Sequence, residues 1–560
     1  MSRTLSATPR RTRLSRICLQ LLAILALVGP VAGCGGADDG SAVPSMVGSS
    51  GGGATPAPAS GTVALTGPLS VSRPGWFNLA ATASENVASV SLFRDGVLVA
   101  RDENRDFAFR VPYTASKIGT ERFEVRGFDQ AGRQIASSTS DVAVNIGRVI
   151  YVSGNGSDTA SGLSEATAKR TLQAAHGISQ PGDSILVMTG IYSEPNPSVN
   201  VLNITRSGRA DAWTAYIGYP GQNPLIRARN WNAIAVQASY IIVEGLTLEG
   251  NRAEVTLAQA EAEATNLNNP ITSGNGISIT PTRTSPAIRP AHVIVRDNEV
   301  RDFPGGGIGS NGADYITIER NRVYRNAWYS PYGNSGISIY QPWNSDNSTG
   351  VKIIVRENIS YENYNFIPFF FSDDDPAQRR VTDGNGIIID DTRNTQRGSP
   401  LGVYPGRALV ENNIVFDNGG RGINVFSSNR VDVINNTSWL NARHPEISSE
   451  TAVVDADDVF LFNNIFVARS DRLASRVSRA TNVALSFNLV SGGTGFQIGS
   501  GTGNLTGDPR FADPTRQDFS LLAASPAIDA GRMAGSPQRD FFGNRRPRGA
   551  GVDIGAIESK

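Results

Sequence analysis

The sequence predicts an all-β chain: a right-handed parallel β-helix, a solenoid, preceded by a small β-sandwich. Two repeated features between residues 275 and 464 predict the solenoid. A glycine followed by isoleucine opens a short apolar run at Gly276, Gly307, Gly336, Gly386 and Gly422. A second short run then ends at an asparagine, namely Asn298, Asn321, Asn358, Asn413, Asn436 and Asn464. The shortest spacings lie in the low twenties, which is typical of coils that bury their apolar faces only by stacking.

The composition sets limits on the class of protein. A chain of 560 residues has room for two or three domains, and 59 glycines and 30 prolines fit a turn-rich β protein. Lys and Arg together number 51, as do Asp and Glu, so the sequence predicts no attraction to nucleic acid. Both cysteines lie within the first 34 residues, which excludes disulfides and cysteine metal sites from the remainder.

Residues 1–34 predict a bacterial lipoprotein signal peptide. Basic residues precede the apolar run Ile17–Val28, which is too short to be read as a spanning helix. The sequence Val-Ala-Gly-Cys then ends at Cys34, the expected lipidated residue. Gly35, rather than aspartate, follows it, which by analogy with other lipoproteins favours the outer membrane or cell surface. A plain secretory signal with a chance cysteine is the alternative.

Residues 35–60 consist mostly of Gly, Ser, Ala and Pro, and we expect a disordered tether there. Residues 61–147 alternate short apolar runs with turn signals such as Asp95-Gly96, which predicts a β-sandwich. The order FRDGVLVARD, VPY, FEVRGFDQAG resembles bacterial immunoglobulin-like modules, which implies a spacer role.

The solenoid is expected over residues 148–503, with residues 504–560 as its C-terminal cap. An amphipathic helix around residues 166–176 is the expected N-terminal cap. Long insertions in a tight solenoid cluster on one edge and often carry function. These insertions are 341–350, 361–382 and 391–406.

Strand alternation predicts which side chains share the outer groove. If the isoleucines after Gly336, Gly386 and Gly422 face the core, then Tyr340, Asp390 and Asn424 face outward on successive coils. Asp383 is expected at the opposite end of its strand, about 23 Å away if the chain is extended, and so unable to share an ion with Asp390 unless the chain folds back.

Carboxylates on this face predict a Ca²⁺ site. Asp391 follows Asp390 directly, and Asp346 lies in the loop leaving the previous coil. Calcium prefers several oxygen ligands, so we expect Asp390, Asp391 and Asp346 to bind it. The alternative is that Asp390 and Asp391 start a turn. The aromatic residues Tyr332, Tyr340 and Trp343 are expected to stack on sugar rings, or else to pack beneath the long loops.

The coil pattern, together with TDGNGIIIDD and then GGRGINVF, resembles right-handed β-helix proteins of the pectate-lyase type, of which polysaccharide lyase family 9 is the nearest. The resemblance implies Ca²⁺ bound by an aspartate cluster, part of which Asp390 and Asp391 match. It also implies a lysine that removes the C5 proton of a uronate. The position that resembles this lysine is Asn424, so a different base is required.

Arginine is the available replacement, and Arg421 and Arg393 are the nearest candidates, with Asp390 the acidic partner; Lys352 lies on a different strand. We therefore expect a monomeric, surface-anchored, Ca²⁺-assisted lyase that cleaves an acidic polysaccharide by β-elimination. A non-catalytic polysaccharide-binding adhesin is one alternative. A hydrolase that uses Asp390 with Asp346, or a C5-epimerase, is another.

Overall fold

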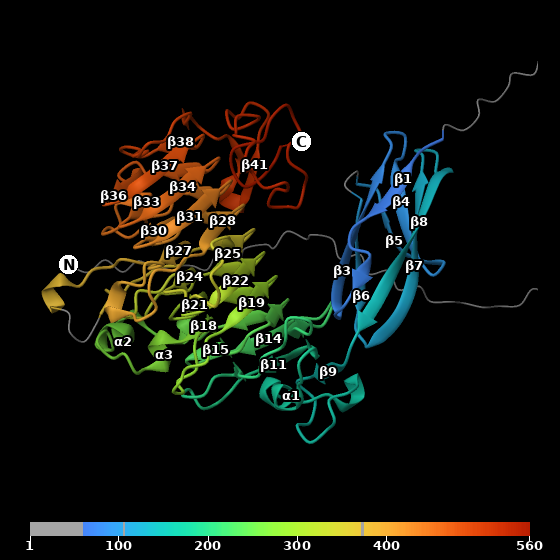
Figure 1. Cartoon of the computed structure of the whole chain (residues 1–560), viewed down its shortest axis with the longest axis horizontal. Helices are drawn as coiled ribbons and strands as arrows, with labels where there is room; N and C mark the ends of the chain where they lie inside the picture. The colour runs from blue at the N-terminus through green and yellow to red at the C-terminus, as the bar shows by residue number, and fades with distance from the viewer. Residues whose placement is uncertain (1–59, 105–106, 371–374, 560) are drawn as a thin grey trace, which may run out of the picture. The chain divides into compact units, whose positions relative to one another are not determined.

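The computed structural model describes residues 60–104, 107–370 and 375–559, and it is almost entirely β (Figure 1). The signal peptide, Cys34 and nearly all of the tether lie outside these residues. In the described part, no helix is long and apolar enough to cross a membrane.

The first eight strands form two sheets of a sandwich, in the orders β1-β3-β6 and β2-β8-β7-β4-β5. All their pairings are antiparallel except that of β2 with β8. Fully buried Leu92, Phe123 and Val125 form part of the core. This arrangement fits the β-sandwich predicted for residues 61–147. Its strands are β1 Val63–Thr66, β2 Ser70–Val71, β3 Gly75–Ala83, β4 Ser89–Arg94, β5 Val97–Asp102, β6 Ala108–Tyr113, β7 Lys117–Phe128 and β8 Gln134–Ile146.

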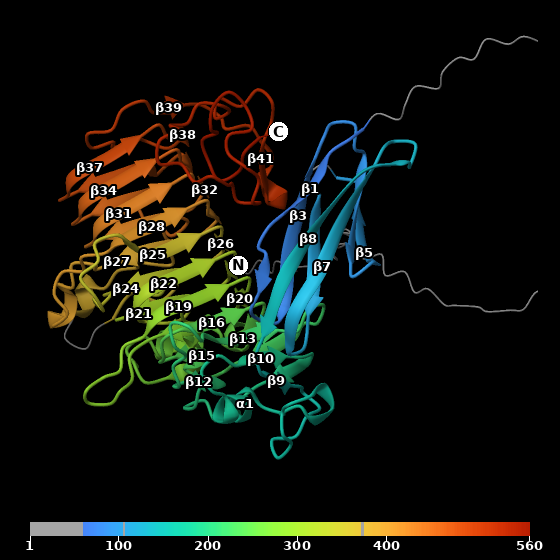
Figure 2. The same ribbon diagram turned by 45° about the vertical axis from the view of Figure 1, so that its right-hand side comes forward.

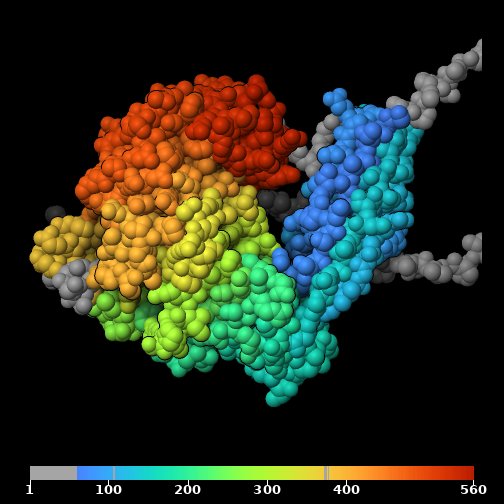
Figure 3. All heavy atoms as spheres, viewed as in Figure 1, coloured from blue at the N-terminus to red at the C-terminus, as the bar shows by residue number. Residues whose placement is uncertain are grey.

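The rest of the chain is a right-handed parallel β-helix with three parallel sheets, as predicted. Successive coils appear as rungs in Figure 2 and as successive bands of colour in Figure 3. The first sheet contains β9 Val149–Val152, β10 Ser184–Val187, β13 Thr214–Gly218, β16 Ile241–Glu244, β19 Ala291–Arg296, β22 Asp314–Glu319, β25 Val351–Arg356, β28 Arg407–Glu411, β31 Asn429–Ile434, β34 Asp457–Phe462 and β37 Thr481–Ser486.

The second sheet follows the first around each coil. It contains β11 Gly190–Tyr192, β14 Pro224–Arg227, β17 Thr247–Glu249, β20 Glu299–Arg301, β23 Arg322–Tyr324, β26 Ile359–Tyr361, β29 Ile414–Phe416, β32 Thr437–Trp439, β35 Ile465–Ala468, β38 Leu489–Gly492 and β39 Leu505–Thr506.

The third sheet contains the strands on which the groove was predicted. It contains β12 Leu202–Ile204, β15 Asn232–Val236, β18 Asn275–Ile279, β21 Ile308–Asn311, β24 Ile337–Tyr340, β27 Ile387–Asp390, β30 Ile423–Phe426, β33 Ser449–Val454 and β36 Leu473–Ser478. In β27 the fully buried Ile387 and Ile389 face the core, and the last residue, Asp390, pairs in register with Tyr340 and Phe426, as predicted.

The asparagine column is a continuous hydrogen-bonded ladder. Each side-chain Nδ2 donates to Oδ1 of the next asparagine at 2.9–3.0 Å. The ladder continues past Asn464 to Asn488 and Asn504. A second ladder, which the sequence reading missed, lies five residues further along the coils and ends on Glu450; its members are Asn326, Asn363, Asn418 and Asn441. Both ladders satisfy buried amides that would otherwise destabilise the coils.

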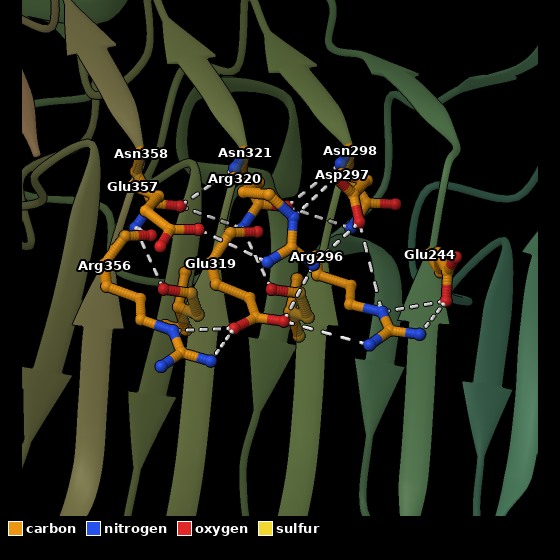
Figure 4. A network of polar contacts seen from close by, with 12 residues as sticks. Glu244, Arg296, Asp297, Asn298, Glu319, Arg320, Asn321, Arg356, Glu357 and Asn358 are labelled. Atoms are coloured by element: carbon orange, nitrogen blue, oxygen red, sulfur yellow. Dashed lines mark hydrogen bonds and ion pairs between the residues drawn. The ribbon is translucent and has the colours of Figure 1, made fainter. Parts of the chain in front are cut away.

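Charged residues of alternating sign occupy the outer end of the first sheet (Figure 4). Glu244, Arg296, Glu319 and Arg356 are in register on consecutive strands. Arg296 lies 2.6 Å from Glu244, and Arg356 lies 2.7 Å from Glu319. Because each carboxylate meets a guanidinium on a neighbouring coil, this charged row is internally neutralised.

Helices cover the start of the solenoid and one of its flanks. Helix α1, Leu172–Ile178, lies where the N-terminal cap was predicted, and the hydroxyl of Thr171 caps it by accepting from the backbone of Ala174. Helices α2, Leu257–Ala262, and α3, Pro270–Ser273, form an excursion before β18. The 3₁₀ turns are η1 Glu165–Thr167, η2 Arg252–Glu254, η3 Pro376–Gln378, η4 Gln396–Gly398 and η5 Pro514–Arg516.

The C-terminal segment packs along the second sheet. It contains β40, Phe511–Asp513, and β41, Asp518–Leu521. Phe519 of this segment contacts Phe416 of β29 at a ring distance of 5.3 Å. Phe496 and Ile498, by contrast, pack against the main core near its last coils. Residues just before 504 therefore help cover the end of the core, while much of the predicted cap lies against the flank.

Candidate functional site

Asp390 is the last residue of β27, in the third sheet, where the groove was predicted. Its Oδ1 accepts a hydrogen bond from Nε2 of Gln396 at 2.7 Å. Burial raises the pKa of Asp390 well above its ordinary value, and repulsion from Asp383 and Asp391 raises it further. Asp390 therefore favours the protonated form more than an exposed aspartate does.

Asp383 belongs to the same site, contrary to the separation expected from an extended strand. It is close enough to Asp390 for mutual repulsion to shift the pKa of Asp390. The segment is not an extended strand as assumed: β27 begins only at Ile387, and Gly384 has a φ of +80°, which glycine adopts without strain. The carboxyl accepts hydrogen bonds from Thr382 at 2.6 Å and Asn385 at 3.1 Å. Burial raises the pKa of Asp383 to about 6, although attraction to Arg421 opposes the shift.

Arg421 brings a positive charge to Asp383. It comes just before β30, and its backbone N–H donates to Oδ1 of Asn385 at 2.9 Å. Its Nε donates to Oγ of Ser449 at 3.3 Å. Burial lowers the pKa of Arg421 to about 10, and Arg476 lowers it further while Asp383 raises it. Arg421 thus lies within electrostatic reach of both Asp383 and Arg476.

Asn424 and Tyr340 complete the site. Asn424, in β30, stacks between Ile388 and Ala452, and Ala452 pairs in turn with Arg476 of β36. Burial raises the pKa of Tyr340 to about 12, and repulsion from Asp390 contributes, so Tyr340 remains a neutral phenol. The groove cluster, as we name it, consists of Tyr340, Asp383, Asp390, Arg421, Asn424 and Arg476.

Asp391 organises a turn. It is fully buried, and Oδ2 accepts from the backbone of Gln396 at 2.8 Å and from Nε2 of Gln341 at 2.9 Å. Oδ1 accepts from the backbone of Thr395 at 2.9 Å. The turn that was expected as the alternative to a metal site therefore accounts for the hydrogen bonds of both carboxylate oxygens of Asp391. The same turn places Gln396 against Asp390.

Asp346 lies with residues of the first sheet. Its Oδ1 is 3.0 Å from Nζ of Lys352 in β25, and its Oδ2 accepts from Tyr315 in β22 at 2.8 Å. Lys352 has no exposed side-chain surface and also lies 2.7 Å from Asp314. Asp346 is therefore committed to this ion pair, and Lys352 is buried away from the groove cluster.

These residues do not fit the expected Ca²⁺ site. Asp391 uses its oxygens in a turn, and Asp346 pairs with Lys352, which leaves Asp390 as the only groove carboxylate of the three. No group of three His, Cys, Asp or Glu side chains suited to a metal ion occurs among the described residues. We derive no catalytic step through Ca²⁺.

The remaining predicted residues lie around the groove. Nη1 of Arg393 donates to the backbone oxygen of Asp455 at 3.1 Å, beyond the end of β33. Tyr332 is 38% exposed and donates its hydroxyl to the backbone of Leu267 in the excursion before β18. Nε1 of Trp343 donates to the backbone oxygen of Pro290 at 3.0 Å. Of the three predicted stacking residues, Tyr340 belongs to the groove cluster.

Sequence reasoning missed Asp383 as a partner of Asp390, and it missed Arg476 altogether. Asp383 lies four residues before Ile387, and only the glycine after it hinted at a bend. Arg476 lies on a coil that opens with Leu473 and Ala474 instead of glycine and isoleucine, so the repeat could not be aligned there.

Comparison with known proteins finds similarity in structure alone. No protein-family model and no curated protein matches the sequence. Pectate lyase Pel9A matches at 16% identity and a TM-score of 0.45, covering 74% of this chain and 97% of that one. XylC in complex with xylose matches at 10% identity, TM-score 0.40, with coverage of 73% and 99%. A rhamnogalacturonan lyase matches at 14% identity, TM-score 0.34, with coverage of 58% and 84%.

Proposed function

We propose that the protein binds an acidic polysaccharide in the groove above the third sheet and hydrolyses its glycosidic bonds. The observation that carries this proposal is a pair of half-buried carboxyls, Asp383 and Asp390, whose electrostatic surroundings differ. Arg421 attracts Asp383, whereas other aspartates repel Asp390. Enzymatic hydrolysis of a glycosidic bond commonly uses two carboxyl groups, one protonated and one ionised. The surroundings of the two aspartates separate their roles in this way.

Asp390 is the general acid. Two other aspartates repel its carboxyl, and no ion pair with a described residue offsets that repulsion. It therefore retains a proton that it donates to the leaving oxygen. Asp383 is held closer to its ionised form by Arg421, so it acts as the base or nucleophile on the other side of the bond.

Arginines give the groove its preference for acidic sugars. Arg421 and Arg476 lie on nearby coils; burial is the main cause of the lowered pKa of Arg421, and repulsion from Arg476 lowers it further. A substrate carboxylate between them relieves that repulsion and accepts charge-assisted hydrogen bonds. We therefore expect polyuronides to bind more tightly than neutral polysaccharides of the same length.

Incubation with a panel of polyuronides tests the proposal. Hydrolysis yields new reducing ends without the ultraviolet absorbance of an unsaturated product. Asp390→Asn should lower the rate by about 10²- to 10⁴-fold, because the replacement cannot donate the proton. Asp346→Asn is the matched control and should retain activity, since Asp346 pairs with Lys352 outside the groove cluster. Polymer binding without any product would instead support the non-catalytic alternative.

A second candidate is β-elimination, favoured by the lowered pKa of Arg421. A pKa of about 10 makes this guanidinium a stronger candidate base than an exposed arginine, whose pKa exceeds about 12. Elimination would produce an unsaturated uronide that absorbs in the ultraviolet and would be lost in Arg421→Ala. Activity measured with and without a chelator reports separately on any metal requirement. Formation of C5-epimerised polymer without cleavage would identify the epimerase alternative.

Anchoring through Cys34 is proposed from the signal sequence. A lipidated cysteine followed by residues 35–60 would hold the groove away from the membrane surface, where it could reach polymers. Fractionation of cells expressing the full chain should find it in the membrane fraction, and Cys34→Ala should prevent lipidation. Recovery of unlipidated wild-type protein would contradict the proposal. We also propose that the protein acts as a monomer, which light scattering of the purified protein tests.

A further inference from the structure

Four rings form a continuous row at the corner between the second and third sheets. Trp328 lies 5.1 Å from Phe366, Phe366 lies 4.3 Å from Tyr364, and Tyr364 lies 5.6 Å from His444, measured between ring centres. We refer to Trp328, Phe366, Tyr364 and His444 as the aromatic row.

The aromatic row runs across the coils, along the solenoid axis. The backbone N–H of Phe366 donates to the oxygen of Trp328 at 3.0 Å, and that of Tyr364 donates to Asn326 at 3.1 Å. On the next coils, Gly419 donates to Asn363, and His444 donates to Gly419. The rings therefore stand on stacked turns of successive coils.

Glycine makes the continuity of the row possible. A Cβ atom at Gly419 would lie only 2.4 Å from Cδ2 of Tyr364, so any side chain there would displace the ring. With glycine present, the ring of Tyr364 covers this coil and reaches His444 on the next one. At the other end, the guanidinium of Arg252 lies 4.1 Å from the ring centre of Trp328.

The aromatic row borders the groove cluster. A Cβ atom at Gly384, the residue after Asp383, would lie 2.8 Å from the backbone nitrogen of Asn365, which separates Tyr364 from Phe366. The backbone of Asn365, between two rings of the aromatic row, is thus in direct contact with Gly384, the residue next to Asp383. A polymer that extends along the axis from Asp383 would pass beside these rings.

We propose that the aromatic row binds sugar rings of the polysaccharide as a ledge beside the groove cluster. Phe366 is 38% exposed although aromatic rings surround it on several sides, so it offers an apolar surface to a ligand. Trp, Tyr and His add polar edges that suit the hydroxyl groups of a sugar.

This proposal rests on the proposed function for the identity of the polymer, but it is tested by binding alone. The experiment uses full-length Asp390→Asn protein, so that turnover does not consume the ligand, with polygalacturonate and alginate as probes in affinity electrophoresis and calorimetry. Phe366→Ala in this background should weaken binding about 5- to 10-fold, the loss expected for one stacking contact.

Matched variants separate stacking from packing. Phe366→Tyr should bind as the parent does, and Phe366→Leu should bind as weakly as Phe366→Ala, because leucine fills space without a flat face. Phe542→Ala removes a ring that is 64% exposed in the C-terminal segment and should leave binding unchanged. Circular dichroism and thermal melting establish that each variant is folded.

Equal binding by the parent and Phe366→Ala would overturn the ledge, as would parent-like binding by Phe366→Leu or a complete lack of binding to both polymers. Weaker binding by Phe366→Ala together with no product from the wild type would retain the ledge and reject the enzyme. Product from the wild type together with unchanged binding by Phe366→Ala would retain the enzyme and reject the ledge.

Discussion

The charged row on the first sheet and the groove cluster on the third are built by the same stacking of coils, yet their carboxyls behave differently. Although burial opposes it, Arg320 and Arg356 lower the pKa of Glu319 below its ordinary value. In the groove cluster, burial raises the pKa of Asp390, and repulsion from Asp383 and Asp391 raises it further. Opposite charges on neighbouring coils offset the effect of burial in the charged row, whereas like charges add to it in the groove cluster.

Exchanging the carboxyls for amides is the strongest test of this contrast. Asp390→Asn should lower polysaccharide cleavage by about 10²- to 10⁴-fold with little change in stability, because it removes a proton donor and relieves repulsion. Glu319→Gln should do the opposite: it leaves Arg320 and Arg356 without their shared carboxylate and lowers the melting temperature. Loss of activity in Glu319→Gln without unfolding would contradict the division between the two regions.

The pH dependence of cleavage sharpens the contrast. Since the pKa of Asp383 is raised to about 6, the base should become protonated below that value. We expect kcat/KM to fall below about pH 6. A profile that stays flat down to pH 4.5, measured on soluble oligosaccharides, would exclude Asp383 as the base. Lys352→Met, far from the groove cluster, should leave the shape of the profile unchanged.

The ladders predict a moderate effect on stability and none on chemistry. Asn358 lies in the middle of the first ladder, where it donates to Asn413 and accepts from Asn321. Asn358→Ala should lower the free energy of unfolding by about 1–3 kcal/mol, because it leaves neighbouring buried groups unsatisfied. Thermal melting measures the loss. A comparable loss is not expected for Asn347→Ala, which is exposed in a loop.

Glu450 predicts the smallest effect, a change in how stability depends on pH. Burial raises its pKa to about 7, so the folded chain binds a proton that the unfolded chain, with an ordinary glutamate, releases at lower pH. Its contribution to stability should therefore decrease as the pH rises from about 4.5 to about 7. Glu450→Gln keeps an acceptor for Asn441 and should remove this part of the slope. An unchanged slope in melting temperature against pH would contradict the assignment.

Periodicity revealed the fold but only part of the site. The glycine–isoleucine repeat and the asparagine column were sufficient to predict the coils and the register of Tyr340, Asp390 and Phe426. The second ladder was missed although Asn321 and Asn326, like Asn358 and Asn363, stand five residues apart on each coil. A search for a second column at fixed offset would have found it.

Bends, loops and ion pairs determine the positions of the site residues that periodicity did not predict. The prediction assumed an extended chain from Asp383 to Asp390, whereas β27 begins only at Ile387 and Gly384 has a positive φ. The loop after Asp391 folds back on that residue through backbone hydrogen bonds, which strand alternation does not describe. Ion pairing with Lys352 places Asp346 with the first sheet, and only the stacked structure reveals that partner.

Product analysis tests the central claim most directly. Wild-type protein, Asp390→Asn and Asp383→Asn are incubated with polygalacturonate and alginate, and reducing ends and ultraviolet absorbance are followed in the same samples. The account predicts new reducing ends without absorbance from the wild type and almost none from either variant. Undiminished cleavage by both variants would show that the paired aspartates are not the catalytic groups.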